Sequence, residues 1–144
     1  MRKRDNQKGK RGLYSELLAL RKSELEAVSE YFLASAFCKE VYPELSDTFV
    51  RFSREHSENL FLIEWMRVHF SIDSPCGVKL TFSGMPSGND RAMIEALARR
   101  ERECKLGYER LYIGEVDSES EEEIKKVLRA FDERLSILEN IMRA

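Results

Sequence analysis

The stretch LYSELLALRKSELEAVSEYFLASAFC, residues 13–38, decides the fold of this chain. Apolar and small side chains recur in it at alternating steps of three and four, which is the period of one buried face of an α-helix. They are Leu13, Leu17, Leu20, Ala27, Tyr31, Ala34 and Cys38. One position of this stripe, Glu24, carries a carboxylate where the pattern predicts an apolar side chain.

A second stretch, IEALARRERECKLGYERL at residues 94–111, repeats the pattern. A shift of 77 residues places Glu101 on Glu24 and Tyr108 on Tyr31. A carboxylate buried among apolar side chains is costly unless it is paired, protonated or bound to a metal. Because such a carboxylate occurs at equivalent positions of both stretches, the pair indicates a functional site or the remnant of one.

Two more stripes predict two more amphipathic helices. The first consists of Leu45, Phe49, Phe52, His56, Asn59, Ile63, Met66 and Phe70, and the second of Ile124, Leu128, Phe131, Leu135, Leu138 and Met142. Pro43 suits a first helical turn, and Asn89 or Ser87 is expected to cap the helix around residues 94–111. Two capping boxes are expected to start the last helix, Ser118 with Glu121 and Ser120 with Glu123.

The connections between these stripes differ in length. Residues 39–42 and 114–121 are short links, so each is expected to join an antiparallel hairpin. Residues 71–90 form a long link with two prolines, three glycines and a β-prone piece at residues 78–82. A link of this length can cross a bundle from end to end. The sequence therefore predicts an all-α antiparallel four-helix bundle with a long crossover between the second and third helices.

The chain has 144 residues, which allows one domain, expected at residues 12–144. Residues 1–11 hold six basic residues and one acidic residue, Asp5. We expect a disordered basic tail there, with the alternative of an arm for nucleic acid or another anionic partner. This arm is the less favoured alternative because the segment has no aromatic side chain for stacking on bases.

Two further features of the composition concern location and cysteine chemistry. Neither an apolar run long enough to span a membrane nor a secretory leader is evident, so we expect a cytoplasmic protein without a membrane partner. The cysteines, Cys38, Cys76 and Cys104, form no CxxC pair, which argues against a zinc ribbon or a thioredoxin-type motif. Cys38 and Cys104 fall on the core stripes and are expected to be small buried apolar side chains.

The chain resembles the ferritin-like superfamily, and more narrowly the rubrerythrin-like and bacterial small ferritin-like proteins, over residues 13–142. The resemblance rests on Glu24 followed by Tyr31, on Glu101 followed by Tyr108, and on Tyr-Pro-Glu-Leu at residues 42–45 before a Phe-rich helix. It implies two hairpins around a crossover. It also implies a Glu-x-x-His motif on the second and fourth helices, which together with the two Glu residues would hold two iron or manganese ions.

This chain departs from that motif on both helices. The corresponding core positions read His56-Ser57-Glu58-Asn59 and Leu135-Ser136-Ile137-Leu138, and no Glu-x-x-His is present. Glu55 and Glu58 lie beside the stripe rather than on it. We therefore expect that the dinuclear centre has been lost.

Two interpretations of the remaining polar set stay open. In the first, a protonated His56 bridges Glu24 and Glu101 without metal or other cofactor, with Asn59 as a donor and Tyr31 and Tyr108 in the next layer. In the second, one Fe, Mn or Zn ion is held by a single atypical site. Its ligands would be Glu24, His56, Asn59 and Glu101.

The functional expectation follows from these interpretations. We expect a non-catalytic structural or partner-binding module; the alternative is a metal-binding, peroxide-linked or oxidoreductase protein, so enzymatic activity is left open. Residues 60–66, Leu60 to Met66, are apolar on nearly all sides of their helix. Either the crossover or a second copy of the chain is expected to cover them, which predicts a possible homodimer.

Overall fold

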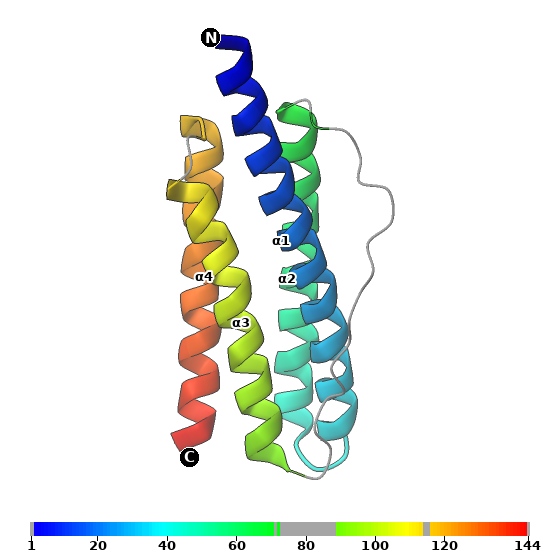
Figure 1. Cartoon of the computed structure of the whole chain (residues 1–144). Helices are drawn as coiled ribbons and strands as arrows, with labels where there is room; N and C mark the ends of the chain where they lie inside the picture. The colour runs from blue at the N-terminus through cyan, green and yellow to red at the C-terminus, as the bar shows by residue number, and fades with distance from the viewer. Residues whose placement is uncertain (1, 71, 73–88, 114–115, 144) are drawn as a thin grey trace.

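The computed structural model describes residues 2–70, 72, 89–113 and 116–143, and of residues 2–11 and 113 it describes the backbone alone. These residues form four α-helices and no strand: α1 (Arg2–Cys38), α2 (Pro43–His69), α3 (Asp90–Ile113) and α4 (Ser118–Arg143) (Figure 1). The predicted all-α class and the number of helices in the described part are confirmed.

The turn between α1 and α2 is tight. The backbone N–H of Tyr42 donates to the carbonyl of Cys38 at 2.7 Å, and Pro43 occupies the first turn of α2, as predicted. Proline suits this place because its missing N–H would have no helical partner there. Both α2 and α3 begin at the lower end of Figure 1, the end at which α1 finishes, whereas α4 begins at the upper end.

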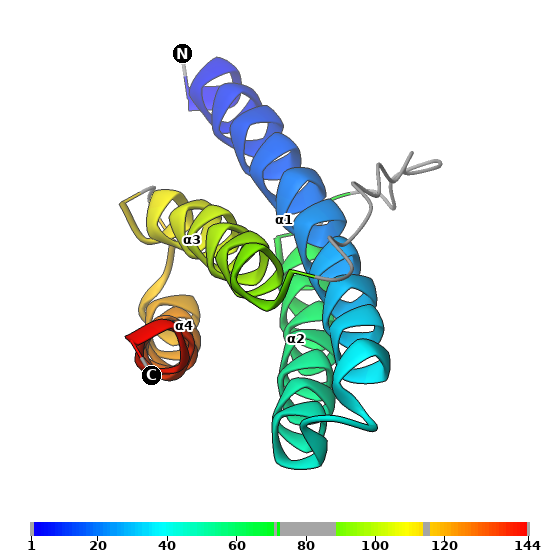
Figure 2. The ribbon, with the colours of Figure 1, turned by 90° about the horizontal axis from the view of Figure 1, so that it is seen from below.

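Packing between the helices is uneven. The most extensive contacts join α1 to α2; α3 packs on both α4 and α1, and α2 and α4 make only sparse contacts (Figure 2). The approach of α3 to α1 depends on Gly107, because a Cβ at this position would lie 2.6 Å from Leu20 Cδ2. Glycine therefore allows the two helices that carry Glu24 and Glu101 to pack closely.

The end of α2 and the start of α3 lie at opposite ends of the bundle (Figure 1). The predicted crossover between them, including Cys76, residues 78–82 and the cap candidate Ser87, falls largely on residues outside the described part. Asn89 is described, and its side-chain oxygen accepts from the backbone N–H of Ala92 at 3.0 Å. This hydrogen bond caps α3.

Helix α1 begins at Arg2, earlier than the domain start expected at residue 12. Extending a formed helix is far easier than nucleating one, so a basic segment attached to a long amphipathic helix continues it. The side chains of residues 2–11 lie outside the described part of the structure. The role of this segment as a solvated tail or a binding arm stays a prediction. Among the described helices, none is both long and apolar enough to cross a membrane.

The predicted stripes of α1 and α3 are buried from Leu17 to Cys38 and from Ile94 to Leu111. The prediction for α4 was partly wrong. Leu135 is only half-buried, while Arg134 beside it is 1% exposed. The rotation of α4 about its axis is set by its packing on α3 and by the carboxylate that Arg134 reaches, neither of which appears in a local apolar pattern.

The start of α4 also differs from the prediction. The cap is Asp117, whose carboxylate accepts from the backbone N–H of Ser120 at 2.9 Å, in place of the two expected capping boxes. Asp117 lies one residue before the helix and its carboxylate reaches an N–H of the first turn, which is the usual geometry of an N-cap. Ser120 turns inward and is buried.

Candidate functional site in the bundle core

A layer of charged side chains crosses the core between two apolar clusters. Each helix contributes one fully buried member: Glu24 from α1, His56 from α2, Glu101 from α3 and Arg134 from α4. The helical stripes fix the first three, because each stands where its stripe faces the bundle axis. Arg134 packs its guanidinium carbon 4.5 Å from the ring centre of Phe131, one turn earlier on the same helix.

His56 joins the two glutamates. Its Nδ1 lies 2.9 Å from Glu24 Oε2, and its Nε2 lies 2.5 Å from Glu101 Oε1. Both ring nitrogens can donate only in the imidazolium form, so this geometry calls for a protonated His56. Burial alone would lower the pKa of His56, but the carboxylates of Glu24 and Glu101 outweigh it and raise that pKa to about 9.

Glu101 is the most heavily bonded member of the layer. Besides His56, it accepts from the Tyr31 hydroxyl at 2.7 Å and from Arg134 Nε, which lies 3.1 Å from each of its oxygens. Burial would raise the pKa of Glu101, but His56 and then Arg134 outweigh it, and the pKa is lowered. Burial, followed by the charge of the Glu101 carboxylate, raises the pKa of Tyr31 well above its usual value.

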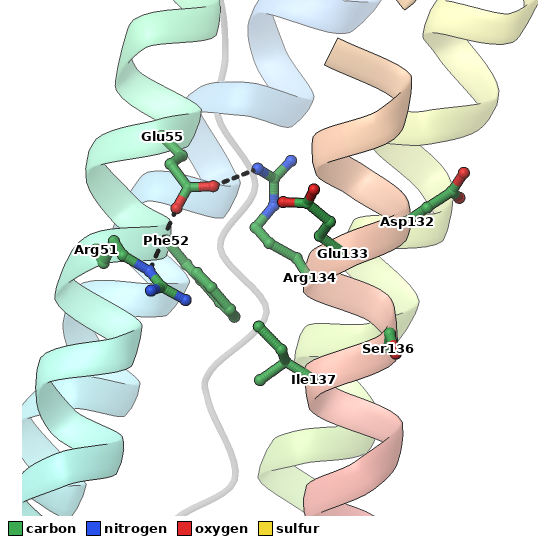
Figure 3. A pocket seen from close by; sticks show the side chains of 8 residues that line it. All are labelled: Arg51, Phe52, Glu55, Asp132, Glu133, Arg134, Ser136 and Ile137. Atoms are coloured by element: carbon green, nitrogen blue, oxygen red, sulfur yellow. Dashed lines mark hydrogen bonds and ion pairs between the residues drawn. The ribbon is translucent and has the colours of Figure 1, made fainter. Parts of the chain in front are cut away.

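Arg134 connects the layer to the surface. Its Nη1 donates to Glu55 Oε1 at 3.0 Å, and Arg51 Nε lies 3.5 Å from the other oxygen of Glu55 (Figure 3). These residues line a groove of about 670 Å³ between α2 and α4, which make only sparse contacts with each other. Glu55 and Arg134 are 79 residues apart, and a shift of 79 residues also superimposes the apolar stripes of α2 and α4, for example Phe52 on Phe131. Glu55 and Arg134 therefore occupy equivalent positions of α2 and α4 and pair with each other.

Glu24 has fewer partners than Glu101. Its Oε2 accepts from His56 and from the Asn59 amide at 3.3 Å, but its buried Oε1 has no hydrogen-bond partner within the described residues. The shift of 77 residues predicts a bond from Tyr108 like the one from Tyr31 to Glu101. Instead the buried Tyr108 hydroxyl also has no partner in the described part.

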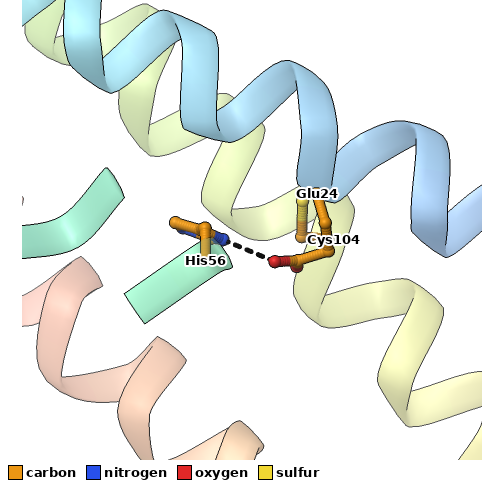
Figure 4. Close-up of side chains that lie close together, drawn as sticks. All are labelled: Glu24, His56 and Cys104. Carbon is orange, nitrogen blue, oxygen red and sulfur yellow. Dashed lines mark hydrogen bonds and ion pairs between the residues drawn. The ribbon is translucent and has the colours of Figure 1, made fainter. Parts of the chain in front are cut away.

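Cys104 lies close to Glu24 and His56. One ligand atom from each of Glu24, His56 and Cys104 falls within 4.8 Å of the others, and the three side chains point toward one another (Figure 4). Burial, followed by the nearby charges of Glu24 and Glu101, raises the pKa of the Cys104 thiol well above its usual value. Cys104 and Cys38 are both free and buried.

The structure brings together five of the six residues that the sequence singled out: Glu24, His56, Asn59, Glu101 and Tyr31. The sixth, Tyr108, lies in the same core but makes no hydrogen bond in the described part. Sequence analysis missed Arg134 as a member of the layer. The sequence signal that could have identified Arg134 is the shift of 79 residues, which makes it the counterpart of Glu55.

His69, the second histidine of the chain, lies outside this layer. It stacks on Trp65 near the end of α2 and contacts the Asp117 carboxylate at 2.5 Å. Hydrogen bonds from His69 and then from Ser120 lower the pKa of Asp117 to about 2. This pair ties the end of α2 to the cap of α4 and is a structural contact.

Comparisons of the chain with models of protein families, with curated proteins and with solved structures found no match.

Proposed function

We propose that this chain is a ferritin-like bundle that has lost the dinuclear iron or manganese centre and acts as a non-catalytic structural or partner-binding module. In this proposal a charged hydrogen-bond network replaces the metal ions. The antiparallel arrangement and the crossover belong to the proposal. They are supported by the positions of the helix ends, since α2 ends and α3 begins at opposite ends of the bundle.

The observation that carries the proposal is the charge balance of the buried layer. The negative charges of Glu24 and Glu101 are matched by a protonated His56 and by Arg134, which leaves the four side chains neutral together. Buried charges persist in a protein core when they are paired and hydrogen-bonded. The pairing of these charges therefore explains how they are held in the core without a dinuclear centre.

The donor set does not fit two metal ions. A dinuclear carboxylate site in a bundle draws a Glu and a Glu-x-x-His from each hairpin. Here α4 supplies the cation Arg134, whose Nε occupies the side of Glu101 that faces α4. A guanidinium cannot bind a metal because it has no acceptor lone pair, and it repels a cation.

Metal analysis of the full chain, purified without chelator, tests the proposal. We expect iron and manganese well below one ion per chain. Stoichiometric iron or manganese in the wild type that disappears in a Glu24→Ala, Glu101→Ala double variant would overturn it. A Glu58→Ala variant is the matched control, because Glu58 is exposed on α2 and should not change the metal content.

A second candidate function is a protein with one atypical metal ion. The observation that favours it is the unpartnered Glu24 Oε1, a buried carboxylate oxygen with free lone pairs. The ligands predicted from the sequence were Glu24, His56, Asn59 and Glu101, but Glu101 is already engaged by three donors. Equilibrium dialysis with Fe and Mn salts separates the candidates, since only the second requires one of these ions to bind at micromolar concentration.

The homodimer is also a proposal. In the region Leu60–Met66, Ile63 and Met66 are buried in the core, while Phe61 is 78% exposed. Trp65 and Val68 extend an exposed apolar strip along the same helix face at helical spacing. We propose that a second copy of the chain covers this strip.

Sedimentation velocity of the wild type and of a Phe61→Lys variant tests the dimer. We expect the wild type to sediment as a dimer at tens of micromolar and the variant to shift to monomer. A Leu106→Lys variant, which changes an exposed apolar residue on α3, is the control. A monomeric wild type over the whole concentration range would remove the dimer proposal.

A further inference from the structure

We propose that the core holds a site for one thiophilic divalent cation, formed by Cys104, Glu24 and His56. The three side chains come from three helices and converge on one point (Figure 4). Their ligand atoms lie within 4.8 Å of one another, so small side-chain movements bring a sulfur, an oxygen and a nitrogen around a common centre. Cys104 was expected from the sequence to be an inert core residue, and nothing in the resemblance assigns it a role.

An unpartnered group gives independent support for the site. Glu24 is fully buried, yet its Oε1 accepts no hydrogen bond within the described residues. A buried carboxylate oxygen without a donor is costly, and binding a cation would remove this cost. The Tyr108 hydroxyl, one turn from Cys104 on α3, also has no partner among the described residues and offers a further oxygen near Glu24.

The donor set selects the class of cation. One thiolate, one imidazole and one carboxylate match the ligands of Zn²⁺ and of its spectroscopic substitute Co²⁺, with a fourth position for water or a hydroxyl. Mg²⁺ and Ca²⁺ prefer oxygen ligands alone and are not expected to bind. The site therefore differs from a carboxylate-rich centre for iron or manganese.

Partners for two of the ligands are already in place around the site. When His56 Nδ1 binds the ion, its Nε2–H keeps the hydrogen bond to Glu101, which Tyr31 and Arg134 hold from two sides. Asn59 donates to Glu24 Oε2 and orients that carboxylate. Such outer hydrogen bonds commonly orient the histidine and carboxylate ligands of protein metal sites.

Charge and protons balance in the binding step. The ion takes the place of the proton on His56 Nδ1 and the proton on Cys104 Sγ, and both protons leave to solvent. A divalent ion thus replaces two positive charges, and the layer stays neutral with Arg134 still paired to Glu101. The inference rests on the proposed function in one respect, namely that no dinuclear centre occupies the same side chains.

Cobalt titration of the full chain tests the site. The protein is a variant in which Cys38→Ala and Cys76→Ser leave Cys104 as the single thiol. Adding Co²⁺ under anaerobic conditions should produce a near-ultraviolet sulfur-to-cobalt charge-transfer band that saturates at one ion per chain. Added Zn²⁺ should displace the cobalt and abolish the band, and added Mg²⁺ should not.

Two further variants make the result specific. In the same background, Cys104→Ala should lose the band completely, and Glu24→Gln should weaken Co²⁺ binding at least tenfold while circular dichroism shows an unchanged helix content. Absence of the band in the parent variant, or its persistence after Cys104→Ala, overturns the inference. Neither result bears on the proposed function, which fails only if the purified wild type carries stoichiometric iron or manganese.

Discussion

Glu24 and Glu101 occupy equivalent positions in the similar buried stripes of α1 and α3, but their surroundings differ. Glu101 receives hydrogen bonds from Tyr31, His56 and Arg134, so both of its oxygens are occupied. Glu24 receives them from His56 and Asn59 on one oxygen, and its other oxygen has no partner in the described part of the chain.

This difference teaches that the two halves of the layer treat their carboxylates differently. In the Glu101 half, both carboxylate oxygens have partners, among them the cations His56 and Arg134. In the Glu24 half, one carboxylate oxygen has no partner in the described residues and the Cys104 sulfur lies within 4.8 Å of a Glu24 oxygen, which is the arrangement of a site able to accept a ligand. Similar local sequences thus serve different purposes because the helices that face them differ.

Removing one carboxylate at a time should produce the largest difference in stability between the two halves of the layer. Glu101→Gln leaves Arg134 and His56 with one buried anion fewer, and we expect it to lower the free energy of unfolding by about 4–5 kcal/mol. Glu24→Gln should lower it by about 2 kcal/mol, since His56 keeps Glu101 and one Glu24 oxygen has no partner among the described residues. Urea unfolding measures both variants; equal losses would contradict the asymmetry between the halves.

Arg134→Met should have the next largest effect. The variant keeps an unbranched apolar side chain but removes the guanidinium that donates to Glu101 and to Glu55, and we expect a loss of about 3 kcal/mol. Arg51→Met is the matched control, because Arg51 lies at the groove mouth and is largely exposed; its loss should be below about 0.5 kcal/mol. A loss in Arg134→Met no larger than the control's would show that the guanidinium does not hold the Glu101 half together.

Alkaline pH should weaken the bridge between the halves. The pKa of His56 is about 9 in the folded chain against about 6.5 when unfolded, so its contribution is complete below the lower value and is lost as the pH rises through the higher one. Because one pKa unit corresponds to about 1.4 kcal/mol, the loss is on the order of a few kcal/mol.

Urea unfolding between pH 6 and pH 10 in the presence of a chelator measures this loss. Nitrogen-15 spectra of the imidazole should show both nitrogens protonated at pH 7.5. A neutral ring at that pH would contradict the bridge, whatever the unfolding curves show.

The two tyrosines give the smallest and sharpest test. Tyr31→Phe removes a hydrogen bond to a charged carboxylate and should cost about 1–2 kcal/mol. Tyr108→Phe removes a buried hydroxyl that has no partner in the described residues, and should be neutral or slightly stabilising. Thermal unfolding of the two variants side by side decides the point, and a larger cost for Tyr108→Phe would indicate a bound water or ion at Glu24.

Sequence alone determined the helical faces of α1, α2 and α3, and with them the positions of Glu24, His56 and Glu101 in the core. Helical periodicity is local, so an apolar stripe shows which side of a helix is buried without knowledge of its neighbours. It also predicted the start of α2 at Pro43, because proline acts on the backbone of its own turn.

Only the tertiary structure decided that Arg134 rather than Leu135 faces Glu101. Adjacent residues differ by about 100° around a helix, and a small rotation of α4 against α3 selects between them. The tertiary structure likewise selected Asp117 among several possible caps, and it gave the Tyr31 hydroxyl a partner while the Tyr108 hydroxyl has none in the described part of the chain. In each case the deciding interaction joins atoms of residues far apart in the chain. No local sequence pattern contains such an interaction.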